Sequence, residues 1–382
     1  MAKAELNYTM ESRIGTKVVL NGKSYLYFGG TSYFQLHSHP EVIKAANDAT
    51  LQYGIGSATT RALTGTTPLL EKIEMKLASY FNTEDAVYLP SGYLSSLAGL
   101  LALDELGLYQ VIFLDEDAHY SLAEGAAATG KAVISFQHRN LDDLERLMKK
   151  HLGPGQRPLI ASDGLFPVMG SLAPIRDYLA ITKKYDGVVW IDDAHGVGIL
   201  GTHGRGTCEA RGSSSSRIYL GATLSKAFGA YGGIIVGNRD FIGKIRSGNV
   251  ITGSSSPMNA AVAAGLKGLE LVQENKHLRK KLWENARYMR EGLEHMRINI
   301  ETDFIPEMHG TVPIFSFTHR NEKTMRSIHS YLMKEGIYTQ YTNYRGAGSE
   351  GIIRVVVSSS HKKVEIVKLT HTLKEAFRSL SS

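Results

Sequence analysis

The fold of this chain is constrained most by an alternation of short apolar runs with longer segments of helical period. The runs AVYLP (86–90), VIFLD (111–115) and PLIASD (158–163) are each followed by such a segment, and VVWIDD (188–193) is followed by a loop. Short apolar runs indicate buried strands, and a 3.6-residue period indicates helices. Strands that alternate with helices form right-handed crossovers and a mostly parallel sheet covered on both faces. The sequence therefore predicts an α/β fold.

A second, smaller unit is predicted toward the C-terminal end. Residues 259–296 have an almost continuous helical pattern, which we interpret as a bridge out of the first unit. Beyond it, VPIFSF and IIRVVVSS are typical of strands, and the segments 324–336 and 364–377 are typical of helices. We predict an N-terminal arm over residues 1–45, a large domain over 46–280 and a small α+β domain over 281–382.

Composition excludes several classes of protein. With 43% hydrophobic and 21% charged residues the chain is typical of globular proteins, and its net charge of +6 favours anionic ligands. Its basic residues are scattered, so nucleic acid is not an expected partner. Cys208 is the only cysteine, so we expect no disulfide framework and no metal site. The longest apolar run, SLAGLLAL, stops at Asp104, so we expect no signal peptide or membrane span and predict a cytoplasmic protein.

Chemically capable side chains follow the predicted strands, where ligands bind in α/β sheets. These residues are Ser91, His119, Asp163, Asp192, His195 and Lys226. Lys226 lies in GATLSKAFGAYGG, between a strand-like run and a glycine-rich segment. Pyridoxal phosphate (PLP) chemistry needs an amine to anchor the aldehyde and a carboxylate to keep the pyridine nitrogen protonated. Lys226 and Asp192 therefore predict a PLP site.

Three more residues surround this predicted pair. Asp193 would point to the opposite side of an extended backbone, so we expect only Asp192 to face the cofactor. The alternative for Asp192 is that it is a loop or capping aspartate. His195 is a candidate partner of the cofactor's phenolic oxygen, or else it caps its loop. His119 follows the VIFLD strand and is a candidate to stack on the cofactor ring, although an isolated histidine is more often structural.

Two further ligand contacts are predicted. Ser91 and Gly92 start a helix in PSGYLSSLAGL, and a helix N-terminus binds phosphate. Thr223 could donate its hydroxyl to the same phosphate, or it is an ordinary strand threonine. Arg354 lies within the apolar run IIRVVVSSS, where a charge needs a partner. That partner is either a substrate carboxylate held in a bidentate fork or a buried Asp or Glu.

Together these motifs resemble the α-oxoamine synthase family of fold-type I PLP enzymes. The resemblance covers most of the chain and rests on SYFQLHSHPEV, RALTGTTPLLEKIEMKLASYF, LPSGYLSSLAGL, DEDAHYSLAEGA, DGLFPVMGSLAPI, WIDDAHGVGILGTHGRGT, TLSKAFG and IIRVVVSSSH. It implies a large domain with a mostly parallel sheet, a smaller α+β C-terminal domain, and a homodimer with active sites at the subunit interface.

By position, the resemblance implies a role for each cofactor-binding residue. Lys226 becomes the Schiff-base lysine, Asp192 pairs with the ring nitrogen, His195 bonds the phenolic oxygen and His119 stacks on the ring. Around the phosphate it places Gly92, Tyr93 and Thr223.

The resemblance also implies contacts to substrate and from a partner chain. Arg354 would bind the amino-acid carboxylate. The segment ITGSSSPMNAA would supply a phosphate contact from the partner, and because the family's threonine aligns with Gly253, that contact falls to Thr252 or Ser254. The family's Asn-Asp-Tyr near the start is replaced by Thr31, Ser32 and Tyr33, which makes Thr31 a candidate substrate contact.

The expected reaction condenses a small amino acid with an acyl-CoA thioester and releases carbon dioxide and CoA, giving an aminoketone. Lys226 would remove the α-proton, and His195 or His119 would polarise the thioester carbonyl. A fold-type I aminotransferase, which needs no thioester, is the alternative. A noncatalytic subunit of a PLP-fold heterodimer is a further alternative, but such a subunit is expected to lack the anchoring lysine.

Overall fold

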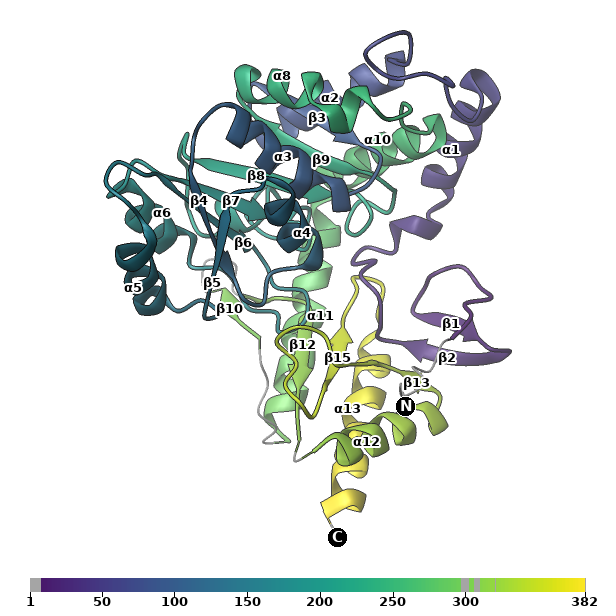
Figure 1. Ribbon diagram of the computed structural model, residues 1–382. Coiled ribbons are helices and arrows are strands. Elements are labelled where there is room, and N and C mark those ends of the chain that lie inside the picture. Colours follow the sequence, from purple (N-terminus) through teal and green to yellow (C-terminus); the bar gives the residue numbers. More distant parts are fainter. Residues whose placement is uncertain (1–7, 297–301, 306–309, 320, 382) are drawn as a thin grey trace, which may run out of the picture.

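The computed structural model describes residues 8–296, 302–305, 310–319 and 321–381, which form two lobes (Figure 1). The large lobe holds a seven-stranded sheet, and the small lobe holds a three-stranded sheet flanked by helices. Helix α11 (Lys276–Glu294) connects them, since Leu282 packs in a core of the large lobe and Met289 packs in the core of the small one. The predicted boundary near residue 280 falls inside this helix, so the division into domains stays a prediction.

The large sheet has the mostly parallel α/β architecture that the sequence predicts. Its strand order is β3-β9-β8-β7-β6-β4-β5, with β9 antiparallel to both of its neighbours. The strands span β3 (Asp85–Leu89), β4 (Val111–Asp115), β5 (Ala132–Phe136), β6 (Pro158–Asp163), β7 (Val188–Asp192), β8 (Ile218–Thr223) and β9 (Gly233–Gly237).

Both faces of the sheet are buried in its central strands because successive side chains point to opposite helical layers. In β7, Val188 and Trp190 pack on one layer, and Val189 and Ile191 pack on the other. The first layer holds α3 (Tyr93–Glu105), α4 (Tyr120–Ala128) and α8 (Arg239–Ser247), and the second holds α5 (Leu141–His151) and α6 (Ile175–Lys183). A Cβ at Gly99 of α3 would lie 2.0 Å from the Trp190 indole, so glycine lets this helix lie directly on β7.

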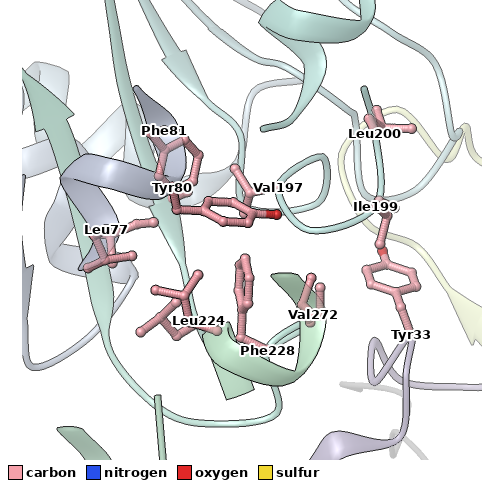
Figure 2. Packing of buried hydrophobic residues seen from close by; sticks show 14 of the residues in the cluster. Tyr33, Leu77, Tyr80, Phe81, Val197, Ile199, Leu200, Leu224, Phe228 and Val272 are labelled. Atoms are coloured by element: carbon pink, nitrogen blue, oxygen red, sulfur yellow. The ribbon is translucent and has the colours of Figure 1, made fainter. Parts of the chain in front are cut away.

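A third apolar core fixes the loops that follow β7 and β8. It lies against α1 (Pro40–Tyr53), α2 (Pro68–Phe81) and α10 (Asn259–Glu274). Val197 from the loop after β7 and Phe228 from the turn after β8 both belong to it, and Figure 2 shows them next to Tyr80. The rings of Tyr80 and Phe228 meet edge to face with centroids 5.9 Å apart. The backbone around His195 and Lys226 is therefore held by packing.

The small lobe presents Arg354 to the large lobe. Its antiparallel sheet has the order β12 (Ile314–Phe317), β15 (Ile352–Val356), β14 (Gln340–Thr342). Phe315 and Val355 pack in the core that α11, α12 (Glu322–Lys334) and α13 (Lys363–Ser381) share, so Ser316 and Arg354 lie on the opposite face. On that face the Ser316 hydroxyl donates to the carbonyl of Val168 in the large lobe.

The N-terminal strands join the small lobe. β1 (Lys17–Leu20) and β2 (Lys23–Tyr27) form a hairpin, and β2 pairs in parallel with β13 (Ile337–Tyr338). The remaining short elements are η1 (Leu36–Ser38), α7 (Thr207–Ala210), α9 (Asn249–Thr252), β10 (Phe304–Ile305) and β11 (Gly310–Thr311). Among the described residues, no helix has both the length and the apolar character needed to cross a membrane.

Candidate active site

A cavity lies at the carboxyl edge of the large sheet. β6, β7 and β8 end there, at Asp163, Asp192 and Thr223. The cavity is lined by Ser91, Gly92, Tyr93, His119, Ser121, Asp163, Asp192, Ala194, His195, Thr223, Ser225, Lys226, Tyr231 and Gly232. The structure therefore brings together most of the site residues that were predicted from the sequence.

The Lys226 amine is the cationic group of this cavity. Burial lowers its pKa to about 8, and the nearby carboxylates of Asp192 and Asp163 oppose that change by favouring the ammonium form. The positive charge of Arg354 lowers the pKa further. An amine with this pKa is partly neutral near physiological pH, which is the state in which it acts as a nucleophile or a base.

Two aspartates lie side by side at the end of the large sheet. Asp163 and Asp192 are paired residues at the ends of β6 and β7. Burial and then the charge of Asp192 raise the pKa of Asp163, whose carboxyl accepts a hydrogen bond from the His119 amide at 2.8 Å. Asp192 accepts from the Ser96 hydroxyl at 3.3 Å and from the Ala194 amide at 3.1 Å.

Asp193 points away from the cavity, as expected. Its carboxylate accepts two bonds of 2.6 Å, from the amide and the hydroxyl of Thr207. Asp193 thus holds the loop that follows β7, and Asp192 is the residue of the pair that lines the cavity.

His119 caps the helix that begins beside the cavity. Its Nδ1 accepts from the Ser121 amide at 3.1 Å, so the proton of the neutral ring lies on Nε2. Burial lowers the pKa of His119, which keeps the ring neutral. The ring contacts the aromatic rings of Tyr93 and Tyr344, at centroid distances of 6.1 and 6.2 Å.

His195 is held by a hydrogen bond to a tyrosine. The hydroxyl of Tyr33 lies 2.8 Å from Nδ1 of His195, so Nε2 is the ring nitrogen available to a ligand. Burial, and then the positive charge of Lys226, lower the pKa of His195 well below its usual range. His195 is therefore a neutral imidazole in this setting.

The start of α3 forms the anion-binding end of the cavity. Gly92 at the N-cap has no side chain, and the Tyr93 amide donates to the Ser91 hydroxyl at 3.2 Å. The N-terminus of a helix carries a partial positive charge, which favours an anion beside it. A Cβ at Gly92 would lie 2.6 Å from the Thr223 hydroxyl, so only glycine allows α3 to start this close to β8. The Ser225 hydroxyl lies 2.8 Å from that of Thr223.

Arg354 has no acidic partner among the described residues. It is 6% exposed, and its Nη1 donates to Oε1 of Gln340 at 3.0 Å. Within the described part of the chain its Nε and Nη2 have no hydrogen-bond partner. The alternative of a buried Asp or Glu partner therefore has no support from the structure.

Four predicted residues, Arg354, Thr31, Thr252 and Ser254, are not among the residues that line the cavity. The Thr252 hydroxyl donates to the Gly248 carbonyl at 3.2 Å, and that of Ser254 donates to the Val250 carbonyl. Thr31 does not line the cavity either. Their roles toward a partner chain and a substrate stay predictions. The described residues contain no group of three or more His, Cys, Asp and Glu side chains placed to hold a metal ion.

Sequence reasoning assigned no role to Tyr33, Ser225 or Gln340. Tyr33 lies 162 residues along the chain from His195, and Gln340 meets Arg354 across the pairing of β14 with β15, so no local pattern indicates either contact. Ser225 precedes Lys226 directly, so the TLSK motif could have indicated it.

Residues 24–373 match the aminotransferase class I and II family. The 8-amino-7-oxononanoate synthase 1 of Bacillus subtilis is 30% identical over 376 residues, which cover 97% of this chain and 93% of the relative. A putative 8-amino-7-oxononanoate synthase of Desulforudis audaxviator is 31% identical over 369 residues, with 94% and 91% covered.

Solved structures share the fold over nearly the whole chain. A serine palmitoyltransferase of Sphingomonas wittichii has a TM-score of 0.90 at 23% identity and covers 99% of this chain and 94% of its own. The 8-amino-7-oxononanoate synthase of Francisella tularensis has a TM-score of 0.77 at 20% identity, with 93% and 98% covered. The expected fold class is confirmed. This chain belongs to the aminotransferase class I and II family, in the group of α-oxoamine synthases that its motifs resemble.

Proposed function

We propose that this protein is a PLP-dependent acyltransferase that condenses a small amino acid with an acyl-CoA thioester. The reaction releases carbon dioxide and CoA and gives an aminoketone. The observation that carries the proposal is one cavity that combines the buried Lys226 amine, the Asp192 carboxylate and the N-terminus of α3. Relatives named 8-amino-7-oxononanoate synthase support this reaction class.

The residues of the cavity fit pyridoxal phosphate at each of its polar ends. Lys226 would be the covalent anchor of the aldehyde, and Asp192 would pair with the pyridine nitrogen. The N-terminus of α3, next to the hydroxyls of Thr223 and Ser225, would hold the phosphate. Tyr93 and Ser91, which line the same end, would complete the phosphate site.

Lys226 is the proposed base for the α-proton of the amino acid. When bound, pyridoxal phosphate supplies a cationic ring that accepts the electron pair left by that proton. With a pKa of about 8, roughly a tenth of the Lys226 amine is neutral at pH 7, against about 0.03% for an ordinary lysine. Burial therefore provides a usable fraction of base without removing the amine's basicity.

His195 and His119 are the two candidates to polarise the thioester carbonyl. Both rings are neutral, because burial lowers the pKa of each. In each ring Nδ1 faces a protein hydroxyl, that of Tyr33 or Ser121, which directs Nε2 to the cavity. His195 is also proposed to bond the cofactor's phenolic oxygen, and His119 to stack on its ring.

We further propose a cytoplasmic homodimer with shared active sites. Large apolar side chains are exposed in two segments that lie side by side, since Thr60 and Ser255 form a bridge between them. These side chains are Leu51 (87% exposed), Ile55 (62%), Leu63 (76%) and Met258 (52%). Such a surface is typical of an interface. Thr252 and Ser254 belong to the second segment, so a partner docked here would bring their hydroxyls toward its neighbour's cavity.

The decisive test is CoA release. The purified protein is supplied with pyridoxal phosphate, then with glycine, alanine or serine and with acyl-CoAs of increasing chain length, and free thiol is measured. We expect thiol release that requires both substrates and is lost in Lys226→Ala. Ketoacid formation without thiol release from any acyl-CoA would replace the proposal with the aminotransferase alternative.

The anchor has its own test. After borohydride reduction, mass spectrometry should find the cofactor on the peptide that contains Lys226. A reduced adduct elsewhere, or one that persists in Lys226→Ala, would show that another amine is the anchor.

A further inference from the structure

We propose that Gln340 is a positioning residue that orients the Arg354 guanidinium by a hydrogen bond to one of its edges. Because Gln340 is uncharged, the other edge of the guanidinium and its positive charge are left for the substrate carboxylate. This inference rests on the proposed function, because it assumes that Arg354 binds an amino acid. It adds a residue outside the cofactor cavity that determines how tightly the amino acid is held.

The sheet of the small lobe places these two side chains together. Gln340 of β14 is directly opposite Arg354 of β15, and directly opposite residues of antiparallel strands have neighbouring side chains on the same face. The amide oxygen of Gln340 accepts from Nη1 of Arg354 at 3.0 Å. On the other side of Arg354 its paired residue is Ser316, whose hydroxyl donates to Val168. Arg354 thus lies between Gln340 and Ser316 on one face of the sheet, and both of these neighbours already make hydrogen bonds.

The bond to Gln340 determines which edge of the guanidinium is free. A guanidinium binds a carboxylate through two parallel N–H donors on one edge. Gln340 occupies Nη1, and Nε with Nη2 have no partner among the described residues. Those two nitrogens form one such edge, so the unused donors have the geometry that a carboxylate needs.

Among the described residues, the charge of Arg354 also has no carboxylate counter-ion. The ionisable groups that act on it most are the hydroxyls of Tyr33, Tyr27 and Tyr344, and none of these is a carboxylate. A buried cation without a counter-ion is unfavourable, so the site is completed by an anion. Arg354 acts on the cavity as well, because its positive charge lowers the pKa of both Lys226 and His195.

The charge of the side chain at position 340 should therefore determine how tightly the amino acid binds. A glutamate here would neutralise Arg354 from within the protein and compete with the substrate carboxylate. A glutamine orients the guanidinium by the same contact without adding a charge. Methionine has a similar length but no strong acceptor, so it should lose the orientation alone.

The test compares Gln340→Glu, Gln340→Met and the exposed control Asn343→Asp in the cofactor-loaded protein. Amino-acid affinity is measured by visible titration without thioester, KM and kcat by thiol release, and thermal stability without substrate. For Gln340→Glu we expect the amino-acid Kd and KM to rise by about tenfold or more, since hydrogen bonds to charged groups are the strong ones. We expect the thioester KM to change little. We expect kcat to fall by less than the amino-acid KM rises, because a neutralised Arg354 no longer lowers the pKa of Lys226.

Stability distinguishes positioning from a structural role. Gln340→Glu should raise the melting temperature of the substrate-free protein while it weakens amino-acid binding, because it supplies the missing counter-charge. Gln340→Met should weaken binding less, by a few-fold, and lower the melting temperature slightly. Asn343→Asp should change neither.

Two results would overturn the inference. One is wild-type amino-acid affinity in Gln340→Glu. The other is a melting temperature that falls in both Gln340 variants together with equal losses in kcat and KM, which is the signature of a structural residue. If no acyl-CoA releases thiol, the proposed acyltransferase function fails. The visible titration and the melting temperatures still decide the role of Gln340 in that case.

Discussion

The pKa of Lys226 is the property of this site that a measurement can test most directly. In the cofactor-free protein, burial is expected to hold that pKa at about 8, compared with 10.5 for an ordinary lysine. Asp192 works in the opposite direction, since its negative charge favours the ammonium form. Asp192→Asn keeps the shape of the side chain and removes the charge. We therefore expect the Lys226 pKa to fall below about 8 in this variant.

The size of the effect follows from the two pKa values. At pH 7 the neutral fraction of an amine with a pKa of about 8 is roughly 300 times that of an ordinary lysine. Its reactivity toward an acylating reagent should rise about tenfold per pH unit below pH 8 and then level off. An unperturbed amine would continue to rise for more than two further units.

The assay is trace acetylation with isotopically labelled acetic anhydride between pH 6 and pH 11, read by peptide mass spectrometry. The exposed Lys362 serves as the internal reference. The expected result is a midpoint near 8 for Lys226 in the wild type and a lower one in Asp192→Asn. A midpoint at 10 or above, or a higher midpoint in Asp192→Asn, would refute the account of burial and charge given for this amine.

Three other outcomes are expected. Gly92→Ala should weaken cofactor binding by about tenfold or more in an absorbance titration, because the new Cβ would lie 2.6 Å from the Thr223 hydroxyl. Gly243→Ala is the control, since the space around its Cβ is open, and it should bind the cofactor normally. Tyr33→Phe removes the bond to His195 and should lower kcat of thiol release by about tenfold with cofactor affinity unchanged, so a wild-type kcat would contradict its role. Leu63→Glu should shift the protein toward monomer in analytical ultracentrifugation, and a wild-type profile would place the interface elsewhere.

Residues that lie next to each other along the chain were the predictable part of this site. Asp192 and His195 follow one strand, and Thr223 and Lys226 follow the next, so a correct strand assignment brings them to the same edge. Tyr33 could not be assigned in this way, because it meets His195 from 162 residues away along the chain. Distant pairs of this kind depend on how whole segments pack, which local periodicity does not encode.

The lobe that the N-terminal strands join could not be predicted from the sequence either. Helices and strands of the small lobe follow from their patterns, but the pairing of β2 with β13 attaches the N-terminal strands to the C-terminal lobe. A single strand pattern gives no information about its partner, since any exposed strand edge offers the same backbone groups.

The sequence by itself determined the α/β alternation, the strand ends that carry the site, and the placement of Lys226 and Asp192 in one site. These follow from local periodicity and from the rule that parallel strands end at one edge. Only the tertiary structure decided the lowered pKa of Lys226, the partner of His195 and the free edge of Arg354. The physical reason is that burial, and hydrogen bonding between segments that are separated along the chain, depend on three-dimensional packing, which sets how far each charge is removed from water.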